Sequence, residues 1–321
     1  MFNRIKKLKN ILIMFLVLIG LIVFFSLFSD NFFSSDNLIN ILRQMATIGI
    51  VAVGMTFVIL TGGMDLSVGS ILALSGVVTG YSMVTLELSI FISILLGMIA
   101  GIIVGLANGV VINFFSIPAF VTTLASMQIF LGVSLIITGG MPIFGFPKAF
   151  DFWGKGYIGP IPVPVIIMTL TMLAGWIVLN KTKYGRYLYA IGGNTEAARL
   201  SGIKIKKNLI ITYVLSGFFA SVASVIALSR LSSAQPKVGL EFGLDVITAV
   251  VLGGVSITGG EGKMSGVIFG VLIIGVLSNG LIMLQVQEYY QYVIKGLVLL
   301  LAVGMDNYTK NNSKKAKLKV V

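Results

Sequence analysis

Apolar residues form long, nearly continuous runs along this chain, separated by short polar or glycine-rich breaks. A run of about 20 apolar residues has the length of a helix that crosses the hydrocarbon core of a bilayer with every backbone group satisfied internally. A membrane β-barrel would instead show alternating segments of roughly ten residues. The pattern predicts an all-α, polytopic membrane protein with about ten transmembrane helices. They are expected at 11–28, 38–60, 66–84, 88–113, 117–138, 161–180, 209–229, 245–260, 264–285 and 291–305.

The composition agrees with this pattern. Hydrophobic residues make up 57% of the 321 residues, charged residues 11%, and the mean hydropathy is +1.03. This is too apolar for a soluble domain, so residues 1–321 are expected to form a single transmembrane domain. The chain has no cysteine and no histidine, which excludes disulfides, Cys/His metal sites and histidine bases. No metal or cofactor is expected.

The basic residues predict the topology. A net charge of +12 would suggest nucleic acid as a partner of a soluble protein, but here 16 of the 23 Lys and Arg lie in three places. Four are in residues 1–10, seven in a central loop (residues 180–208) and five in the tail (residues 306–321). The positive-inside rule places all three in the cytoplasm and leaves no role for nucleic acid. Six predicted spans precede the loop and four follow it. Both numbers are even, so the span count also places the two termini and the loop on the same side of the membrane.

The central loop contains a short helix with recognisable start and stop signals. Asn194 or Thr195 can accept the free N–H groups at its start, and Glu196 complements the positive end of its dipole. Gly202 can adopt the left-handed conformation that ends a helix. The residues alone leave two interpretations open, a docking element or a solvated basic turn that only fixes topology.

Glycines predict close helix packing. Gly97, Gly101, Gly105 and Gly109 recur every four residues on one face, where they let two helix backbones approach in lipid. Two glycine-rich breaks, residues 61–69 and 258–266, share the sequence Thr-Gly-Gly and a glycine seven residues after the first Gly, which suggests an internal repeat. Outer loops are expected at 139–160 and 230–244, as a lid or receptor-facing surface or as simple turns.

Polar residues within the apolar runs are candidates for a solute path, because a charge at mid-bilayer is costly. Asp65 is either the N-cap of the third span or part of that path. No series of carboxylates crosses the membrane, which argues against proton or sodium coupling and favours an uncharged, hydroxyl-rich solute. The candidate path residues are Thr61, Asp65, Ser67, Ser70, Asn108, Asp245 and Asn279.

Several motifs resemble those of one family. Glu196-Ala197-Ala198 followed by Gly202 resembles the core of the loop by which permeases of ABC importers contact their ATPase. The segment 59–70, Ile-Leu-Thr-Gly-Gly-Met-Asp-Leu-Ser-Val-Gly-Ser, resembles the signature of ribose, galactose and xylose permeases. Segments 230–236, 249–256 and 289–296 are most similar to the ribose branch of that family, and the resemblance covers almost the whole chain in order.

The resemblance implies a multi-pass permease of the bacterial inner membrane that forms a homodimer in lipid. Its implied partners are a cytoplasmic ABC ATPase subunit, which would hydrolyse the ATP, and an extracytoplasmic sugar-binding protein. The implied ATPase-coupling residues are Asn194, Thr195, Glu196, Ala197, Ala198, Arg199, Ser201 and Gly202. The permease itself would not be an enzyme. Ribose is the expected sugar. The alternative substrates are galactose, xylose, allose and the furanose signal autoinducer-2. The alternative classes of protein are an ion-coupled secondary transporter and a purely structural scaffold.

Overall fold

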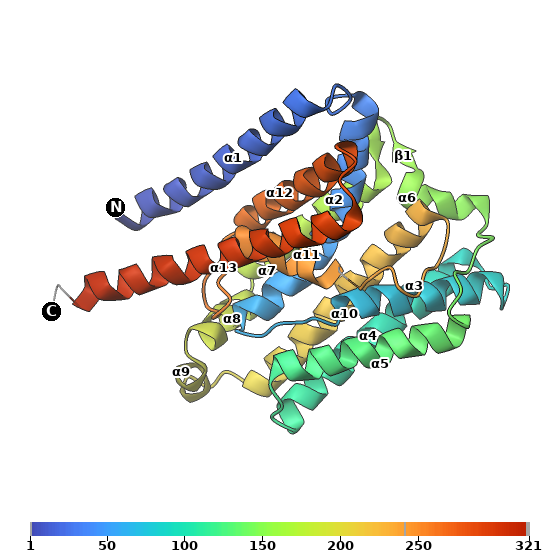
Figure 1. Ribbon diagram of the computed structural model, residues 1–321. Coiled ribbons are helices and arrows are strands. Elements are labelled where there is room, and N and C mark those ends of the chain that lie inside the picture. The colour runs from blue at the N-terminus through green and yellow to red at the C-terminus, as the bar shows by residue number, and fades with distance from the viewer. Residues whose placement is uncertain (1, 241, 319–321) are drawn as a thin grey trace.

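The computed structural model describes residues 2–240 and 242–318, with side chains for residues 12–240 and 242–304. It is a helical bundle, shown in Figure 1. The long helices are α1 (Phe2–Phe28), α2 (Ser35–Leu60), α3 (Val68–Val84), α4 (Ile90–Phe114), α5 (Ala119–Thr138), α7 (Val163–Lys181), α10 (Ile205–Leu231), α11 (Phe242–Leu252), α12 (Met264–Met283) and α13 (Glu288–Leu318). The shorter elements are η1 (Lys148–Asp151), α6 (Phe152–Lys155), β1 (Tyr157–Ile158), β2 (Ile161–Pro162), α8 (Lys183–Gly193) and α9 (Thr195–Leu200). The two strands pair antiparallel in a minimal hairpin.

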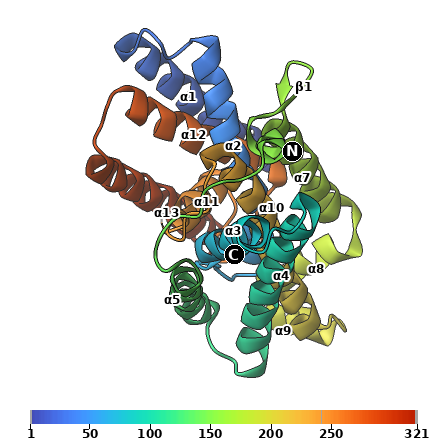
Figure 2. The same cartoon turned by 90° about the vertical axis from the view of Figure 1, so that its right-hand side faces the viewer.

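The centre of the bundle is formed by α2, α3 and α10. In the most apolar stretch of α2, 83% of the residues are buried, and in that of α10, 61%. The corresponding shares are 28% for α4, 22% for α5 and 28% for α7, so these helices present most of their apolar side chains outward. An outer surface made of apolar side chains is stable only in lipid or against another apolar partner. Figure 2 shows α5 at the periphery of the bundle.

Six helices, α2, α4, α5, α7, α10 and α12, are long and apolar enough to cross a membrane. Three shorter apolar helices, residues 12–28, α3 and α11, accompany them. The prediction of a polytopic helical membrane protein is therefore confirmed. Each of the ten expected ranges overlaps one helix, but the number of complete crossings stays a prediction.

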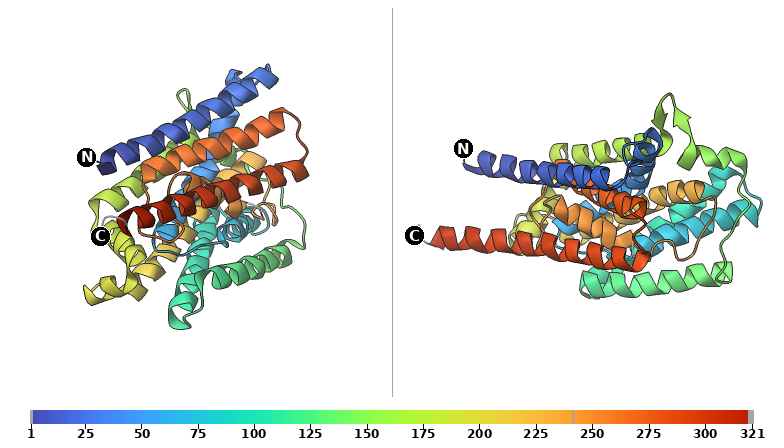
Figure 3. Two further views of the ribbon diagram at one scale, coloured as in Figure 1. Left: turned by 60° about the vertical axis from the view of Figure 1, so that its left-hand side comes forward. Right: turned by 45° about the horizontal axis from the view of Figure 1, so that its top comes forward.

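The two ends of the bundle differ. The start of α1, the far end of α13 and α9 lie at one end, and α6 with the β1–β2 hairpin lies at the other (Figures 1 and 3). The three basic segments are thus at the same end of the molecule, as the positive-inside rule requires. We call this end the inner end and the opposite one the outer end. In the tail, residues 306–318 continue α13.

Two helices, α3 and α11, are each preceded by a segment that consists largely of turns. The break between α2 and α3 is residues 61–67, and the segment before α11 is residues 232–240. The first turn of α3 touches the segment before α11, since a Cβ on Gly69 would collide with the carbonyl oxygen of Gly239. The expected span 245–260 is wrong in its second half, since α11 ends at Leu252 and the chain reverses through Gly254 at φ +78°. A left-handed glycine ends a helix at no steric cost.

Candidate functional site

The central loop folds into α8 and the short helix α9. Asn194 has extended backbone angles, and its Oδ1 accepts the backbone N–H of Ala197 at 2.9 Å, so Asn194 is the N-cap of α9. The alternative cap, Thr195, instead donates its hydroxyl to the carbonyl of Ile191 at 2.9 Å. The hydrogen bond from Asn194 satisfies one of the N–H groups that a helix start leaves free.

Gly202 ends α9 as its sequence predicted. Its φ of +81° is left-handed, and the N–H of the next residue, Ile203, donates to the carbonyl of Ala198 at 3.1 Å. This bond pattern is the glycine-dependent C-terminal cap of helices. The hydroxyl of Ser201 donates to the carbonyl of Ala197 at 2.9 Å. Both ends of α9 are therefore fixed by hydrogen bonds, although the helix has only six residues.

The exposed side of α9 carries an ion pair and a leucine. Arg199 donates Nε to Glu196 Oε2 at 3.0 Å, and these hydrogen bonds hold the pKa of Glu196 below its usual value. An exposed pair of this kind adds little stability, but it orients both side chains. Ala198 is buried, whereas Leu200 is 76% exposed. Leu200 was missed in the sequence, where its signal was a lone apolar residue within a polar loop.

The last residues of α8, Gly192 and Gly193, contact the chain at the start of the first glycine-rich break and within the second, backbone to backbone. The N–H of Gly260 donates to the carbonyl of Leu60 at 2.9 Å. A Cβ on Gly192 would collide with that same carbonyl, and a Cβ on Gly259 would lie 2.8 Å from the N of Gly62. We call this meeting of three backbone segments the glycine junction. The two breaks, which are similar in sequence, thus touch each other in space. Their backbones are also alike, since Gly62 and Gly259 both have a φ of +81°.

Two tyrosines hold α8 against the rest of the inner end. Tyr184 and Thr212 of α10 share a hydrogen bond of 2.8 Å between their hydroxyl oxygens, and Tyr189 donates its hydroxyl to the carbonyl of Gly262 at 3.0 Å. The helix that precedes α9 is thus tied both to α10 and to the second glycine-rich break.

Asp65 is the centre of a buried polar network between α3, α4 and α10. Its carboxylate is fully buried. Oδ1 accepts the backbone N–H of Ser67 at 3.0 Å and the hydroxyl of Ser67, while Oδ2 accepts the hydroxyl of Ser216 at 2.8 Å. Asn108 donates its amide to the Ser67 oxygen at 2.8 Å. A buried carboxylate with several donors is compensated for its lost hydration.

The position of Asp65 tests the first of its two interpretations, the N-cap of the third span. The N-cap of α3 is Ser67, two residues later, so the interpretation of Asp65 as the N-cap is wrong. Asp65 instead closes a local turn onto the N–H of Ser67, the kind of turn that Asp side chains favour. Its burial means that no solute reaches it in this conformation, and its place on a path stays a prediction.

The structure brings together five of the seven candidate path residues. Thr61, Asp65, Ser67, Ser70 and Asn108 lie in or beside the first break, where Thr61 donates to the carbonyl of Val58 at 2.7 Å and Ser70 to that of Ser67 at 2.9 Å. The other two lie apart. Asn279 of α12 exchanges two amide hydrogen bonds, of 3.0 and 2.9 Å, with Asn37 of α2.

Asp245, the last candidate, makes an ion pair within the apolar part of the protein. The Nζ of Lys295 lies 2.7 Å from its Oδ2. Asp245 lies in the first turn of α11, where a carboxylate also complements the helix dipole. This pairing neutralises both charges, as charges in apolar surroundings require.

The glycines of α4 lie against other helices. A Cβ on Gly101 would lie 2.8 Å from the Cβ of Ser221 and 2.9 Å from the carbonyl of Gly217, both on α10. A Cβ on Gly105 or Gly109 would likewise meet the α10 backbone, and one on Gly97 would collide with Thr79 of α3. The helix backbones therefore approach closely along this face.

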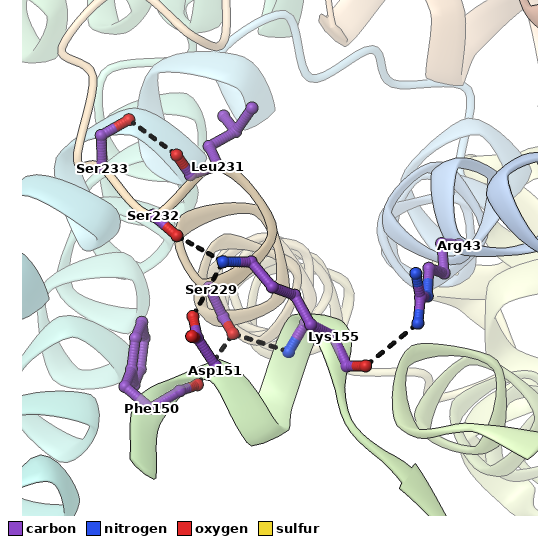
Figure 4. Close-up of polar contacts among 9 residues, drawn as sticks. Arg43, Phe150, Asp151, Lys155, Ser229, Leu231, Ser232 and Ser233 are labelled. Carbon is purple, nitrogen blue, oxygen red and sulfur yellow. Dashed lines mark hydrogen bonds and ion pairs between the residues drawn. The ribbon is translucent and has the colours of Figure 1, made fainter. Parts of the chain in front are cut away.

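The loop at the outer end is an ordered platform (residues 147–162) attached to the end of α10 (Figure 4). Ser229 of α10 accepts the N–H of Gly154 at 2.7 Å and donates its hydroxyl to the carbonyl of Phe150 at 2.8 Å. Lys155 pairs with Asp151 at 2.9 Å. Arg43 of α2 donates to the carbonyl of Lys155 at 3.0 Å. Residues 148–162 thus contain two short helices and a hairpin, and the role of this loop as a lid or receptor-facing surface stays a prediction.

Comparison with known proteins gives consistent similarities over most of the chain. The family described as branched-chain amino acid transport system / permease component matches residues 37–303. The chain is 46% identical over 298 residues to the ribose import permease protein RbsC of Haemophilus influenzae, covering 92% of each chain. It is 47% identical over 294 residues to RbsC of Bacillus subtilis, covering 91% of each. The L-arabinose transport system permease protein AraH of Escherichia coli is 40% identical over 307 residues, covering 96% of this chain and 92% of AraH. No solved structure matches the chain.

Proposed function

Since the chain belongs to the family of branched-chain amino acid transport system permease components, we propose that it is the membrane subunit of an ATP-driven ABC importer for ribose. It is a multi-pass protein of the bacterial inner membrane. The observation that carries the choice of sugar is the 46–47% identity, over nine-tenths of the chain, to the ribose import permeases of Haemophilus influenzae and Bacillus subtilis. The arabinose permease is similar at 40%.

We infer that ATP is hydrolysed by a separate cytoplasmic ATPase subunit. A phosphate-binding loop needs Gly-x-x-x-x-Gly-Lys-Ser/Thr, and around Gly262-Lys263 the chain has Ile257 and Met264 at the other two positions. The role left for this chain is to form the path and to respond to the ATPase. A permease without its own nucleotide site needs a surface that receives the movement of its partner.

That surface, in this proposal, is α9. The helix is capped at both ends, lies at the inner end of the bundle, and exposes Leu200 and the pair Glu196–Arg199. Because both ends are fixed by hydrogen bonds, a force on α9 moves it as a unit. The glycine junction and the tyrosine contacts of α8 support this role, since they connect the helix before α9 to both breaks and to α10.

The platform at the outer end is proposed to receive the sugar-binding protein. It is held on Ser229 of α10, the same helix that contacts Asp65 through Ser216 and α8 through Thr212. One continuous helix of 27 residues thus spans from the platform to the central loop. An event at one end can therefore reach the other through rigid structure.

An ion-coupled secondary transporter is the competing proposal. Within the described part of the chain, the two buried or nearly buried carboxylates in the apolar region are Asp65 and Asp245. Asp65 accepts three hydrogen bonds and Asp245 has a lysine partner. Neither is arranged in a series that crosses the membrane, which favours ATP-driven transport.

The test is the ATPase activity of the assembled complex in liposomes with a binding protein loaded with one sugar at a time. Stimulation by ribose, and not by arabinose, galactose, xylose or allose, supports the proposal. Stimulation by another sugar keeps the importer and changes its substrate. No assembly with any ATPase, together with uptake that collapses when the ion gradient is removed, overturns the proposal in favour of the secondary transporter.

Variants of α9 test the coupling. Glu196→Lys places a like charge beside Arg199, and Gly202→Pro forbids the φ of +81° that ends α9. Both proteins are expected to insert normally and to lose ribose-stimulated ATPase activity. Glu87→Lys, an exposed glutamate at the other end of the bundle, is the matched control and should keep it. Normal uptake in both α9 variants would remove α9 from the mechanism.

A further inference from the structure

One buried hydroxyl near Asp65 has no hydrogen-bond partner. The side chain of Tyr213 on α10 is 1% exposed, and its hydroxyl makes no hydrogen bond to any residue that the structure describes. It packs against the first glycine-rich break, where a Cβ on Gly63 would lie 2.6 Å from the hydroxyl oxygen. The carboxylate of Asp65, two residues later, lies close enough to act electrostatically on this hydroxyl. Buried tyrosine hydroxyls usually have a hydrogen-bond partner, so this one is a donor that the present conformation leaves unused.

Tyr213 lies one helical turn from the donor that Asp65 uses in this conformation. Ser216 of α10 donates to Oδ2 of Asp65 at 2.8 Å, and Tyr213 precedes Ser216 by three residues. Residues three apart lie on the same face of a helix, separated by about 4.5 Å along its axis. One face of α10 thus carries two hydroxyl donors beside a single carboxylate. Because α10 runs from the inner end to the outer end, Tyr213 is the donor nearer the inner end (Figure 1).

Exchange of one donor for the other would move the first break past α10 by one helical turn. Among the described residues, the bond from Ser216 is the one hydrogen bond between residues 61–67 and α10. Residues 61–67 consist largely of turns, so they can shift without breaking the hydrogen bonds of a helix. Displacements of one turn between packed elements are a known kind of two-state transition.

Contacts of α8 lie next to both partners of this exchange. Thr212, the residue before Tyr213, shares a hydrogen bond with Tyr184 of α8. The glycine junction joins α8 to Leu60, the last residue of α2 before the first break. A displacement of α9 that reaches α8 therefore acts on α10 beside Tyr213 and on the start of the break.

We propose that Tyr213 is a positioning residue of the transport cycle, whose hydroxyl replaces that of Ser216 as the donor to Asp65 when α9 is moved. This rests on the proposed function, because the ATPase supplies the movement. In the second conformation Tyr213 donates to Oδ2, and the break lies one turn nearer the inner end. The released Ser216 donates to the carbonyl of Thr212, as serines within helices do. The buried carboxylate keeps a donor in both conformations, so neither pays for an uncompensated charge.

A double-mutant cycle on the purified permease tests whether Tyr213 can serve Asp65. Tyr213→Phe removes a hydroxyl that is unpaired here, so the melting temperature in detergent should equal that of the natural protein. In the Ser216→Ala background the same change removes the remaining donor, and the melting temperature should fall by a few degrees. Tyr81→Phe is the matched control, because its hydroxyl on α3 also makes no hydrogen bond to the described residues. It should have no effect in either background. Additive effects of Tyr213→Phe and Ser216→Ala overturn the proposal.

Ribose uptake by the complex with its ATPase and binding protein tests whether transport uses the exchange. The Tyr213→Phe complex is expected to take up ribose about tenfold more slowly, the effect of losing one hydrogen bond to a charged group. Tyr81→Phe should transport at the natural rate. Natural uptake by Tyr213→Phe overturns the role in transport. If the cycle shows coupling but the natural protein takes up no ribose, the substrate is refuted and the exchange of donors stands.

Discussion

The ammonium nitrogen of Lys295 on α13 lies 2.7 Å from Oδ2 of Asp245 on α11, in side chains that are only 20% and 16% exposed. Among the described elements, α13 packs chiefly on α11, and α11 is a short helix of 11 residues. The ion pair is therefore a main attachment of the last helix to the bundle. Loss of one partner would leave the other charge without compensation in apolar surroundings.

Asp245→Asn is accordingly expected to destabilise the protein by at most about 3 kcal/mol, the lower limit for breaking a fully buried ion pair, because both side chains are partly exposed. The measurement is thermal unfolding in detergent. The exchange variant, Asp245→Lys with Lys295→Asp, should recover part of the loss. Asp30→Asn, at an exposed aspartate, is the control. If both asparagine variants melt at the same temperature, the pair does not hold α13.

Ser216→Ala tests the network around Asp65. The substitution leaves Oδ2 of a fully buried carboxylate without its donor, which costs about 1–3 kcal/mol. We expect lower abundance in the membrane and a lower melting temperature. Ser134→Ala is the matched control, because the buried Ser134 hydroxyl donates only to the carbonyl of Phe130 on its own helix. A Ser216 variant as stable as this control would show that Asp65 finds another donor.

Ser229→Ala tests the attachment of the outer platform. The hydroxyl holds two backbone groups, the N–H of Gly154 and the carbonyl of Phe150, and methyl replaces neither bond. We expect faster amide hydrogen exchange in residues 148–156, with the inner end unchanged. Ser224→Ala, whose hydroxyl donates only within α10, should leave the exchange as it is. Unchanged exchange in the Ser229 variant would mean that other contacts fix the platform.

Gly101→Leu tests the close approach of α4 and α10. A side chain there would enter space occupied by Ser221, Ser75 and the backbone of Gly217. Overpacking typically costs about 1–3 kcal/mol for small insertions, and leucine adds more atoms than that, so membrane abundance should fall clearly. Gly20→Leu, where a Cβ meets nothing within 4 Å, is the control and should express normally. Equal abundance of the two variants would contradict the packing role.

The apolar runs predicted the long helices well because each long helix is a continuous apolar run bounded by polar residues or glycine. The expected spans 38–60 and 88–113 differ from α2 and α4 by at most three residues at either end. The error lay at α11, where an apolar run continued past the glycine turn that ends the helix. Apolar composition does not distinguish a buried helix from a buried turn.

The local part of the site was predictable, and its long-range part was not. The caps of α9 follow from Asn194 and Gly202, which act within a few residues. The long-range partner of Asp65 is Ser216, 151 positions away, and no local pattern marks one serine among many as a donor. The outer platform depends in the same way on Ser229 and Gly154, which are 75 positions apart.

The glycine junction has a mechanical consequence. At this point the turns after α2 and α11 and the last residues of α8 touch backbone to backbone, through glycines that carry no side chain. Side chains between two packed segments can normally absorb small displacements by changing rotamer. Where only peptide planes are in contact, that compliance is missing. A shift of an ångström at the end of α8 is therefore expected to reach residues 61–67 almost undiminished, so the stiffness of this point sets how small a movement of a partner the membrane part can register.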